Sequence, residues 1–132
     1  MTASCSTVDL ENLFQALSDR TRLRLLNLMS DQEICVCYFV EVLGEPQSKI
    51  SRHLACLRRA GLVAARREGK WMHYRLLPPP SAAVAKIVRE TIVSLRDDRL
   101  MQADRTGLEK ACCHPERSIG LAGAPVPARV CQ

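Results

Sequence analysis

The 132-residue sequence contains few aromatic residues and no long hydrophobic run. Aromatic side chains make up 4% of it, and no segment approaches the roughly 20 consecutive apolar residues that a membrane-spanning helix needs. The first residues also lack the basic and apolar segments of a signal peptide. We therefore expect no membrane association, no export and a cytoplasmic location.

The length of the chain leaves room for one hydrophobic core, because domains commonly run to about 100–200 residues. Apolar residues at 47% and charged residues at 25% exclude a largely disordered, collagenous or fibrous chain. We expect a flexible N-terminus at residues 1–8 and a single domain at residues 9–105. Residues 106–132 contain cysteines, and their glycines and prolines predict a mobile tail.

Hydrophobic spacing predicts a mainly α-helical domain. Apolar residues recur at helical intervals over residues 9–17, 21–29 and 35–43, which indicates three helices. A fourth helix is expected from near Pro46 to Gly61, with a basic face opposite its apolar stripe. The short connection between the third and fourth helices is typical of a helix-turn-helix.

The pattern changes to that of a small β-hairpin after Gly61. Residues 62–65 are apolar and extended in character, Gly69 supplies a turn, and residues 71–75 return. Together these elements predict a winged helix-turn-helix. A last amphipathic helix follows the three prolines at 78–80 and is expected to run to about Ala103. We expect the first and last helices to form the interface of a homodimer; the alternative is that the last helix packs on its own core.

Positive charge is concentrated in the fourth helix and the hairpin. Between Ser48 and Arg75 eight basic residues face one acidic residue, a local net charge of +7 in a chain whose net charge is +5. Such a segment suits the phosphates of double-stranded DNA, and small polar or basic side chains near the start of a helix can reach base edges. The expected DNA contacts are Gln47, Ser48, Lys49, Ser51, Arg52 and His53 on the helix and Arg66, Arg67 and Lys70 on the hairpin. His53 is equally consistent with a half-buried structural histidine.

Three motifs occur in order along this domain: Leu17 to Leu23 (LSDRTRL), Glu33 to Cys37 (EICVC) and Gln47 to Leu54 (QSKISRHL). The sequence from roughly Leu10 to Ala103 resembles the ArsR/SmtB family of bacterial metal-sensing repressors, and specifically its arsenite-responsive ArsR branch. The resemblance implies a homodimeric winged-helix repressor, not an enzyme. It further implies that the protein occupies the promoter of its own operon and leaves it when a metalloid binds.

Seven cysteines in a chain expected in a reducing compartment indicate metal binding or thiol reactivity. The resemblance implies that Cys35 and Cys37 bind trivalent arsenic or antimony, soft ions that select thiolates. The ArsR branch has a third cysteine where this sequence has Val40. Either organic trivalent arsenicals, which need two thiolates, are preferred, or a third thiol comes from elsewhere in the chain.

The spacing of Cys35 and Cys37 suggests how binding would act. If both lay in one helix, they would project about 200° apart, so gripping one ion would unwind the start of that helix. Because that helix packs beside the expected DNA-reading helix, a ligand that prefers the distorted form would lower DNA affinity.

Other thiols offer further ligands. Cys112 and Cys113, with Cys131 beyond them, could form a separate site, complete the first one, or be incidental exposed thiols. Cys56 is expected to pack, and Cys5 could serve as a spare ligand. Residues 81–103 contain no histidine, so we expect none of the zinc ligands that zinc-sensing relatives carry on the last helix.

Other functions remain as alternatives. A repressor that responds to thiol oxidation would use the same cysteines. From a different class, the protein could be a thiol-based reductase or a protein that scavenges metals or arsenicals. No acid–base pair accompanies the cysteines, which disfavours a reductase, and a scavenger would have no use for the basic segment.

Overall fold

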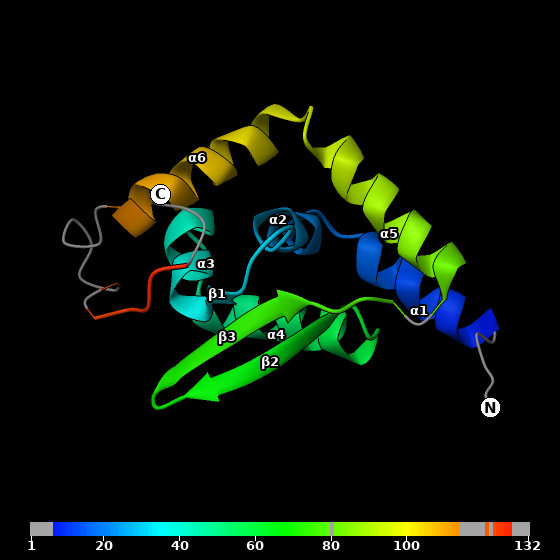
Figure 1. Cartoon of the computed structure of the whole chain (residues 1–132), viewed down its shortest axis with the longest axis horizontal. Helices are drawn as coiled ribbons and strands as arrows, with labels where there is room; N and C mark the ends of the chain where they lie inside the picture. The colour runs from blue at the N-terminus through cyan, green and yellow to red at the C-terminus, as the bar shows by residue number, and fades with distance from the viewer. Residues whose placement is uncertain (1–6, 80, 114–120, 122, 128–132) are drawn as a thin grey trace.

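The computed structural model describes residues 7–79, 81–113, 121 and 123–127, which form six helices and one three-stranded antiparallel sheet (Figure 1). The helices are α1 (Thr7–Leu17), α2 (Arg20–Leu28), α3 (Val36–Leu43), α4 (Gln47–Arg59), α5 (Ala82–Leu95) and α6 (Arg99–Cys113). The strands are β1 (Ile34–Cys35), β2 (Val63–Glu68) and β3 (Trp71–Leu76). The expected mainly α-helical winged helix-turn-helix is confirmed. No helix in the described residues has the length and apolar character needed to cross a membrane.

Short polar and glycine residues set the ends of the elements that surround α3. The Asp19 carboxylate accepts a hydrogen bond from the Arg22 backbone N–H at 3.1 Å, which caps the start of α2. Gly44 ends α3 in the left-handed conformation, with φ of 68°, which favours glycine. Gly69 has φ of 58° at the tight turn between β2 and β3. The helix-turn-helix and the wing therefore follow from local sequence.

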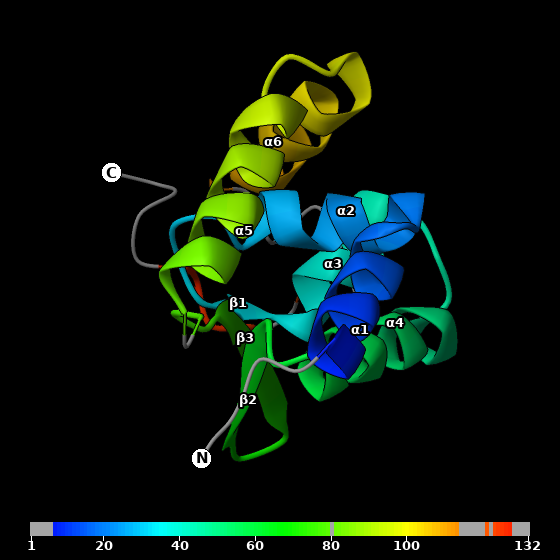
Figure 2. The same cartoon turned by 90° about the vertical axis from the view of Figure 1, so that its right-hand side faces the viewer.

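Helix α2 lies at the centre of the fold and packs against α1, α4, α5 and α6. Its side chains Leu25 and Leu26 are fully buried, as are Tyr38 and Phe39 from α3. Helices α5 and α6 form an angled pair on one side of α2, while α4 and the hairpin lie on the other (Figures 1 and 2). This arrangement presents α4 and the wing on one face.

The third helix begins one residue later than expected, because Cys35 belongs to a strand. Ile34 pairs with Tyr74 and Cys35 pairs with His73 of β3, so the sheet has the order β1-β3-β2. Cys35 itself has extended dihedral angles, φ of −69° and ψ of 141°, and precedes the first turn of α3. One of the two expected ligands is therefore attached directly to the wing sheet.

The apolar stripe predicts one last helix that runs to about Ala103, but the structure has two helices there. Helix α5 ends at Leu95, and the Asp98 carboxylate starts α6 by accepting hydrogen bonds from the N–H groups of Leu100 at 2.9 Å and Met101 at 3.2 Å. Residues 106–113, which we expected in the tail, form the second half of α6.

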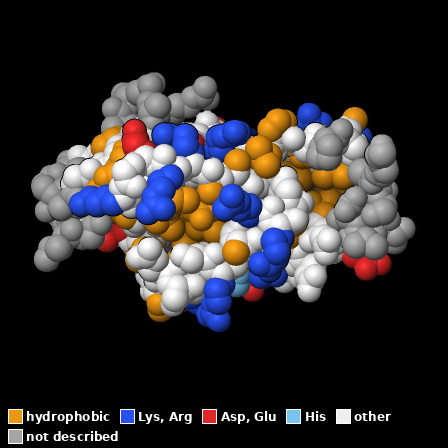
Figure 3. Space-filling view, turned by 90° about the horizontal axis from the view of Figure 1, so that it is seen from below, with side chains coloured by type: hydrophobic (Ala, Val, Ile, Leu, Met, Phe, Trp, Pro, Cys, Tyr) orange, Lys and Arg blue, Asp and Glu red, His pale blue; other side chains and the backbone are white. Residues whose placement is uncertain are grey.

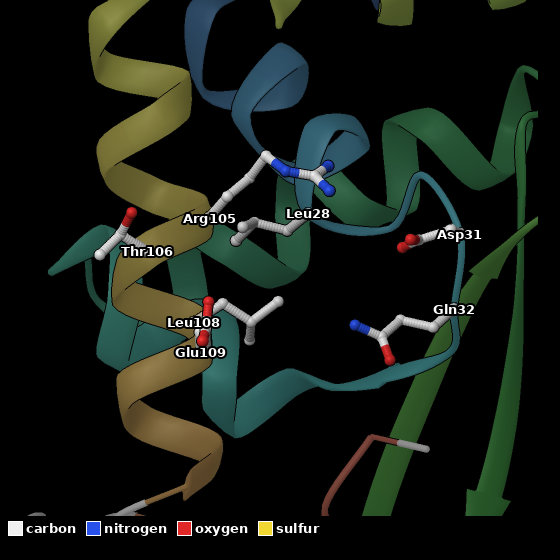
Figure 4. Close-up of a pocket in the computed structure, with 7 residues that line it drawn as sticks. All are labelled: Leu28, Asp31, Gln32, Arg105, Thr106, Leu108 and Glu109. Atoms are coloured by element: carbon white, nitrogen blue, oxygen red, sulfur yellow. The ribbon is translucent and has the colours of Figure 1, made fainter. Parts of the chain in front are cut away.

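Helix α6 is held to α2 by a buried polar network. Arg24 donates two hydrogen bonds to the Asp104 carboxylate, at 2.7 and 2.9 Å. The Asn27 side chain donates to the Met101 carbonyl at 3.0 Å, and Arg105 donates to the Ser30 hydroxyl at 2.9 Å. Arg105 extends from α6 across a pocket of about 200 Å³ towards the segment that follows α2 (Figure 4). These contacts fix the position of α6 above α3.

Candidate functional site

The exposed face of α4 carries the polar side chains that the sequence singled out. Ile50, Leu54 and Leu57 of this helix are buried in the core. Of the expected DNA contacts on α4, four are exposed: Gln47, Ser48, Ser51 and Arg52. The molecular face seen from below carries many lysine and arginine side chains and few acidic ones (Figure 3). It is suited to a polyanion.

The other two expected contacts on α4 already have protein partners. The Lys49 ammonium lies 3.2 Å from a Glu45 carboxylate oxygen. The Nδ1 atom of half-buried His53 lies 3.2 Å from the Arg22 guanidinium, which can only donate, so the imidazole accepts there. Burial, aided by the charge of Arg22, lowers the pKa of His53. These contacts support the structural interpretation of His53, which ties α4 to the start of α2.

The wing presents its basic residues in three different ways. Arg66 donates to the Glu33 carboxylate from Nε, at 3.1 and 3.2 Å, and from Nη2 at 2.6 Å. The Arg67 Nε donates to the Gly69 carbonyl at 3.2 Å, and the Lys70 ammonium lies 4.9 Å from the centre of the Trp71 ring. Arg67 and Lys70 have no acidic partner among these contacts, whereas Arg66 is ion-paired.

Cys35 and Cys37 form a close thiol pair at the junction of β1 and α3. The Cys37 thiol donates a hydrogen bond to the Cys35 sulfur, with a separation of 3.0 Å between the Sγ atoms. This bond lowers the pKa of Cys35 to about 6, against the opposing effect of burial. The same bond, together with burial, raises the pKa of Cys37. The lowered pKa favours the thiolate form of Cys35, which is the form that binds thiophilic ligands.

This geometry corrects our expectation that a ligand must unwind the start of α3. The 200° separation applies only when both cysteines lie within one helix. Because Cys35 lies in β1 and Cys37 in the first turn of α3, the two sulfurs already face each other. The two sulfurs are therefore adjacent without any unwinding of α3.

The described structure places the two expected tail ligands in different environments. Cys112 is buried in the contact between α6 and the core, and burial raises the pKa of its thiol to about 12. Cys113, the next residue, is exposed at the end of α6 and disulfide-bonded. Cys5 and Cys131 lie outside the described residues. Cys56 is a partly buried free thiol packed against the core.

Sequence reasoning missed Tyr38 and His73. The Tyr38 hydroxyl is fully buried and has no hydrogen-bond partner in the described structure. Burial, with smaller contributions from the charges of Cys112, Cys37 and Cys35, raises its pKa to about 12. His73 is buried opposite Cys35, with Nε2 at 2.9 Å from the Glu68 carboxylate. Neither residue carries a sequence motif; only the fold brings them to the thiols.

A cavity of about 400 Å³ adjoins Cys35 on the side of the wing. Its lining includes Glu33, Arg66 and His73 together with the tail segment Pro125–Pro127. Cys35 itself is only 1% exposed. Within the part of the chain that the structure describes, no three His, Cys, Asp or Glu side chains converge closely enough to hold a metal.

An apolar surface remains uncovered on α1 and α5. Phe14 is 53% exposed and Val93 is 44% exposed, although both are large hydrophobic residues. A groove of about 610 Å³ lies between α1, the start of α2 and α5, lined by residues that include Leu17, Leu23 and Leu95. A surface of this kind is typical of a protein interface.

Comparisons with known sequences point to one family. A family model described as "Bacterial regulatory protein, arsR family" matches residues 19–65. The arsenical resistance operon repressor of Escherichia coli is 51% identical over 79 residues, which cover 59% of this chain and 68% of that protein. The arsenic resistance transcriptional regulator ArsR2 of Pseudomonas putida is 36% identical over 110 residues, covering 77% of this chain and 96% of that protein.

Solved structures have the same architecture. HlyU from Vibrio cholerae is similar with a TM-score of 0.58 and 30% identity, over 71% of this chain and 96% of that one. The homodimeric winged helix-turn-helix DNA-binding domain Mb0332 from Mycobacterium bovis has a TM-score of 0.57 and 25% identity, over 75% of this chain and 94% of that one. The second of these is also described as a possible ArsR-family transcriptional regulator.

Proposed function

This chain belongs to the ArsR family of bacterial regulatory proteins, and we propose that it is a transcriptional repressor induced by trivalent arsenic or antimony. It binds promoter DNA as a homodimer through α4 and the wing. The inducer binds the sulfurs of Cys35 and Cys37 and lowers the affinity for DNA.

The observation that carries the proposal is the contact of 3.0 Å between the sulfurs of Cys35 and Cys37. Trivalent arsenic and antimony are soft ions that prefer thiolates to imidazole or carboxylate ligands. The pair supplies a thiolate, Cys35, beside a protonated thiol, Cys37, so condensation with an As–OH group can release water. The names of the two relatives, which concern arsenical resistance, also support arsenic as the inducer.

The position of the Cys35–Cys37 pair suggests two routes by which inducer binding could change the arrangement of the DNA-binding face. Helix α3 packs against α4, and the buried Phe39 lies in this common core. Cys35 also pairs through its backbone with His73 of β3, a strand of the wing. A ligand that binds better to one arrangement of these elements shifts the population towards that arrangement. DNA affinity then falls by the ratio of the ligand affinities for the two forms.

Replacing either Cys35 or Cys37 with serine is expected to abolish release by arsenite. Serine retains the size of the side chain but gives the ligand no sulfur, so promoter DNA stays bound at arsenite concentrations that release the unmodified protein. Fluorescence anisotropy of labelled promoter DNA measures this. The control is Cys56→Ser, which removes a free thiol from α4 and should leave the arsenite response intact. Normal arsenite release from both Cys35→Ser and Cys37→Ser would refute the assignment.

The same titration distinguishes an arsenic-responsive repressor from the alternative, a repressor that responds to thiol oxidation. A repressor that senses oxidation would release DNA with hydrogen peroxide and not with arsenite. The disulfide at Cys113 makes this comparison worthwhile, and a non-thiol reductant should be present during the arsenite titration. Release by arsenite under reducing conditions is the result that we expect.

Arg52 tests the DNA-binding surface. Arg52→Ala is expected to weaken promoter binding by about 1–3 kcal/mol, roughly 5- to 150-fold, because the exposed guanidinium lies on the proposed reading face of α4. Arg96→Ala, at the exposed end of α5, removes the same charge and should change affinity far less. Equal losses in the two variants would mean that only net charge matters. Both affinities should be measured at several salt concentrations.

The dimer is proposed from the uncovered apolar surface of α1 and α5 and from the homodimeric relative in Mycobacterium bovis. Two copies related by twofold symmetry would cover Phe14 and Val93 and present two α4 helices to successive half-sites of DNA. In this dimer, the apolar surface of the second copy would cover the apolar groove between α1 and α5.

A further inference from the structure

The side chain of Arg22 connects the end of α1 to helix α4. Its Nε atom donates a hydrogen bond to the Ala16 carbonyl at 2.9 Å, and its Nη2 atom donates to the Gln15 carbonyl at 2.9 Å. Its Nη1 atom donates to Nδ1 of His53 at 3.2 Å. Helix α2, which carries Arg22, packs against both α1 and α4. One side chain of α2 therefore holds the backbone of one helix and a ring atom of another.

The guanidinium of Arg22 supplies the positive charge that the end of α1 lacks. The last carbonyl groups of a helix have no partner within that helix, and a cation near them is favourable. The last turn of α1 contains no basic residue, so the charge comes from the helix that follows. The two carbonyls that Arg22 binds belong to the residues directly after Phe14, which lies on the proposed dimer surface. Arg22 is thus attached to the dimer surface through the backbone of α1.

The imidazole of His53 is a suitable acceptor for this donor. A guanidinium only donates, so Nδ1 accepts and, in the neutral ring, Nε2 carries the proton. Burial lowers the pKa of His53 against the opposing charge of Asp19, which favours the neutral form. His53 lies in α4 between the exposed Arg52 and the buried Leu54. The contact with Arg22 is therefore made beside the proposed DNA-reading face.

The shape of an arginine side chain makes this connection directional. The guanidinium is planar and holds its N–H groups in a fixed fork, so three acceptors bound to it keep fixed relative positions. All three nitrogen atoms of Arg22 are used in this way. The apolar contacts that bury Ile50, Leu54 and Leu57 hold α4 on the core without preferring one direction, whereas hydrogen bonds require a particular distance and angle.

We propose that Arg22 and His53 are positioning residues, which hold α4 in a set place relative to α1 and so match the two reading helices of the dimer to the spacing of two DNA half-sites. This inference rests on the proposed function, in which α4 binds DNA and α1 and α5 form the dimer. Half-sites of this kind lie about 34–36 Å apart, one helical turn of DNA. A displacement of α4 relative to α1 occurs in both copies, so it weakens simultaneous binding of two half-sites far more than binding of one.

The test compares two changes of His53 on two DNA duplexes. His53→Asn keeps an acceptor oxygen at the δ position, whereas His53→Leu places a methyl group there on a side chain of similar size. One duplex is the promoter with both half-sites, located by footprinting with the unmodified protein, and the other contains a single half-site. For His53→Leu, affinity for the promoter should fall roughly 10- to 30-fold, while affinity for the single half-site stays within about twofold. His53→Asn should stay within about threefold of the unmodified protein on both duplexes.

Arg22→Lys provides an independent variant. It keeps the charge but loses the fork, so it should also weaken binding to the promoter and leave binding to the single half-site nearly unchanged. The double variant Arg22→Lys/His53→Leu should bind the promoter no more weakly than the weaker of the two single variants, because both changes remove the same contact. The control is Arg20→Lys, the same substitution at an exposed position of α2, which should bind both duplexes normally.

Partial unfolding cannot imitate the expected pattern, because it lowers the fraction of competent protein and weakens binding to both duplexes alike. Equal losses on the two duplexes, or unchanged promoter affinity in both His53→Leu and Arg22→Lys, would overturn the proposal while leaving α4 as the DNA-binding helix. The same holds if His53→Asn loses as much promoter affinity as His53→Leu. An unmodified protein that binds the promoter no more tightly than the single half-site would instead contradict the proposed dimeric repressor itself.

Discussion

Replacing Phe14 with glutamate is expected to produce a monomer that binds promoter DNA roughly 10²- to 10⁴-fold more weakly. Phe14 is the most exposed large hydrophobic side chain in the described residues, and it borders the groove between α1 and α5. In the proposed dimer, a glutamate there would place a charge from each copy in an apolar interface, which disfavours association. A monomer binds only one half-site, so it loses the gain in affinity that a dimer obtains by binding two linked half-sites.

Sedimentation velocity measures the oligomeric state, and anisotropy with labelled promoter measures the affinity. Val126→Glu is the matched control, because Val126 is 50% exposed but belongs to the tail segment rather than to α1 or α5. It adds the same charge and should leave a dimer of normal affinity. A Phe14→Glu protein that remains dimeric and binds promoter DNA normally would place the interface elsewhere.

Asp104→Ala is expected to lower the free energy of unfolding by about 3 kcal/mol, the lower part of the range for a broken buried ion pair. It removes the acceptor of two hydrogen bonds from Arg24, whose side chain is only 16% exposed, and leaves its charge with only the weaker electrostatic interaction with Glu45. The lower value is appropriate because Arg24 keeps some contact with water. Urea denaturation followed by circular dichroism measures the change.

The control for this change is Arg20→Gln. It breaks an ion pair with Asp98 whose side chains are 60% and 36% exposed, and should lower the free energy of unfolding far less. The double variant Arg24→Met/Asp104→Leu should recover much of the lost stability, since it leaves no unpaired buried charge. If Asp104→Ala destabilised the protein no more than Arg20→Gln, the attachment of α6 would not depend on this pair.

The elements with strong local signals could be predicted from sequence. The apolar stripe of α4 and the glycine turn at Gly69 indicated the helix-turn-helix and the wing, and both are confirmed. The segment β1 could not be predicted in this way, because two residues are too short to show an alternating pattern. Its existence depends on pairing with His73 and Tyr74, which are distant in sequence.

The break between α5 and α6 was missed for a different reason. No glycine or proline interrupts residues 82–103, so the stripe that ends at Leu95 predicts one continuous helix, although Leu100 and Met101 fall out of its phase. The capping carboxylate of Asp98 is the local signal that marks the break. Gly107 favours irregular structure by its type, but it lies inside α6 where that helix approaches α3.

The chemistry of the candidate site was only half visible in the sequence. Cys35 and Cys37 stand in a recognisable motif, but their relative orientation depended on the unpredicted strand. The burial of Cys112 against the core depends on the docking of α6, to which the buried pair Arg24–Asp104, some 80 residues apart in sequence, contributes. Long-range contacts of this kind leave no local pattern.

The ion pair of Arg66 with Glu33 leaves part of this guanidinium available to DNA. Its Nε and Nη2 atoms face the Glu33 carboxylate, but the side chain is 51% exposed and its other N–H groups remain available to a phosphate. Glu33 directly precedes Ile34 and Cys35, so this ion pair joins the wing to the strand that carries Cys35, in addition to the pairing of β1 with β3. If DNA binding and arsenic binding are coupled as proposed, the coupling is reciprocal, and promoter DNA changes the arsenic affinity of the thiol pair by the same factor by which arsenic changes DNA affinity. The operator would then be an effector of the thiol site.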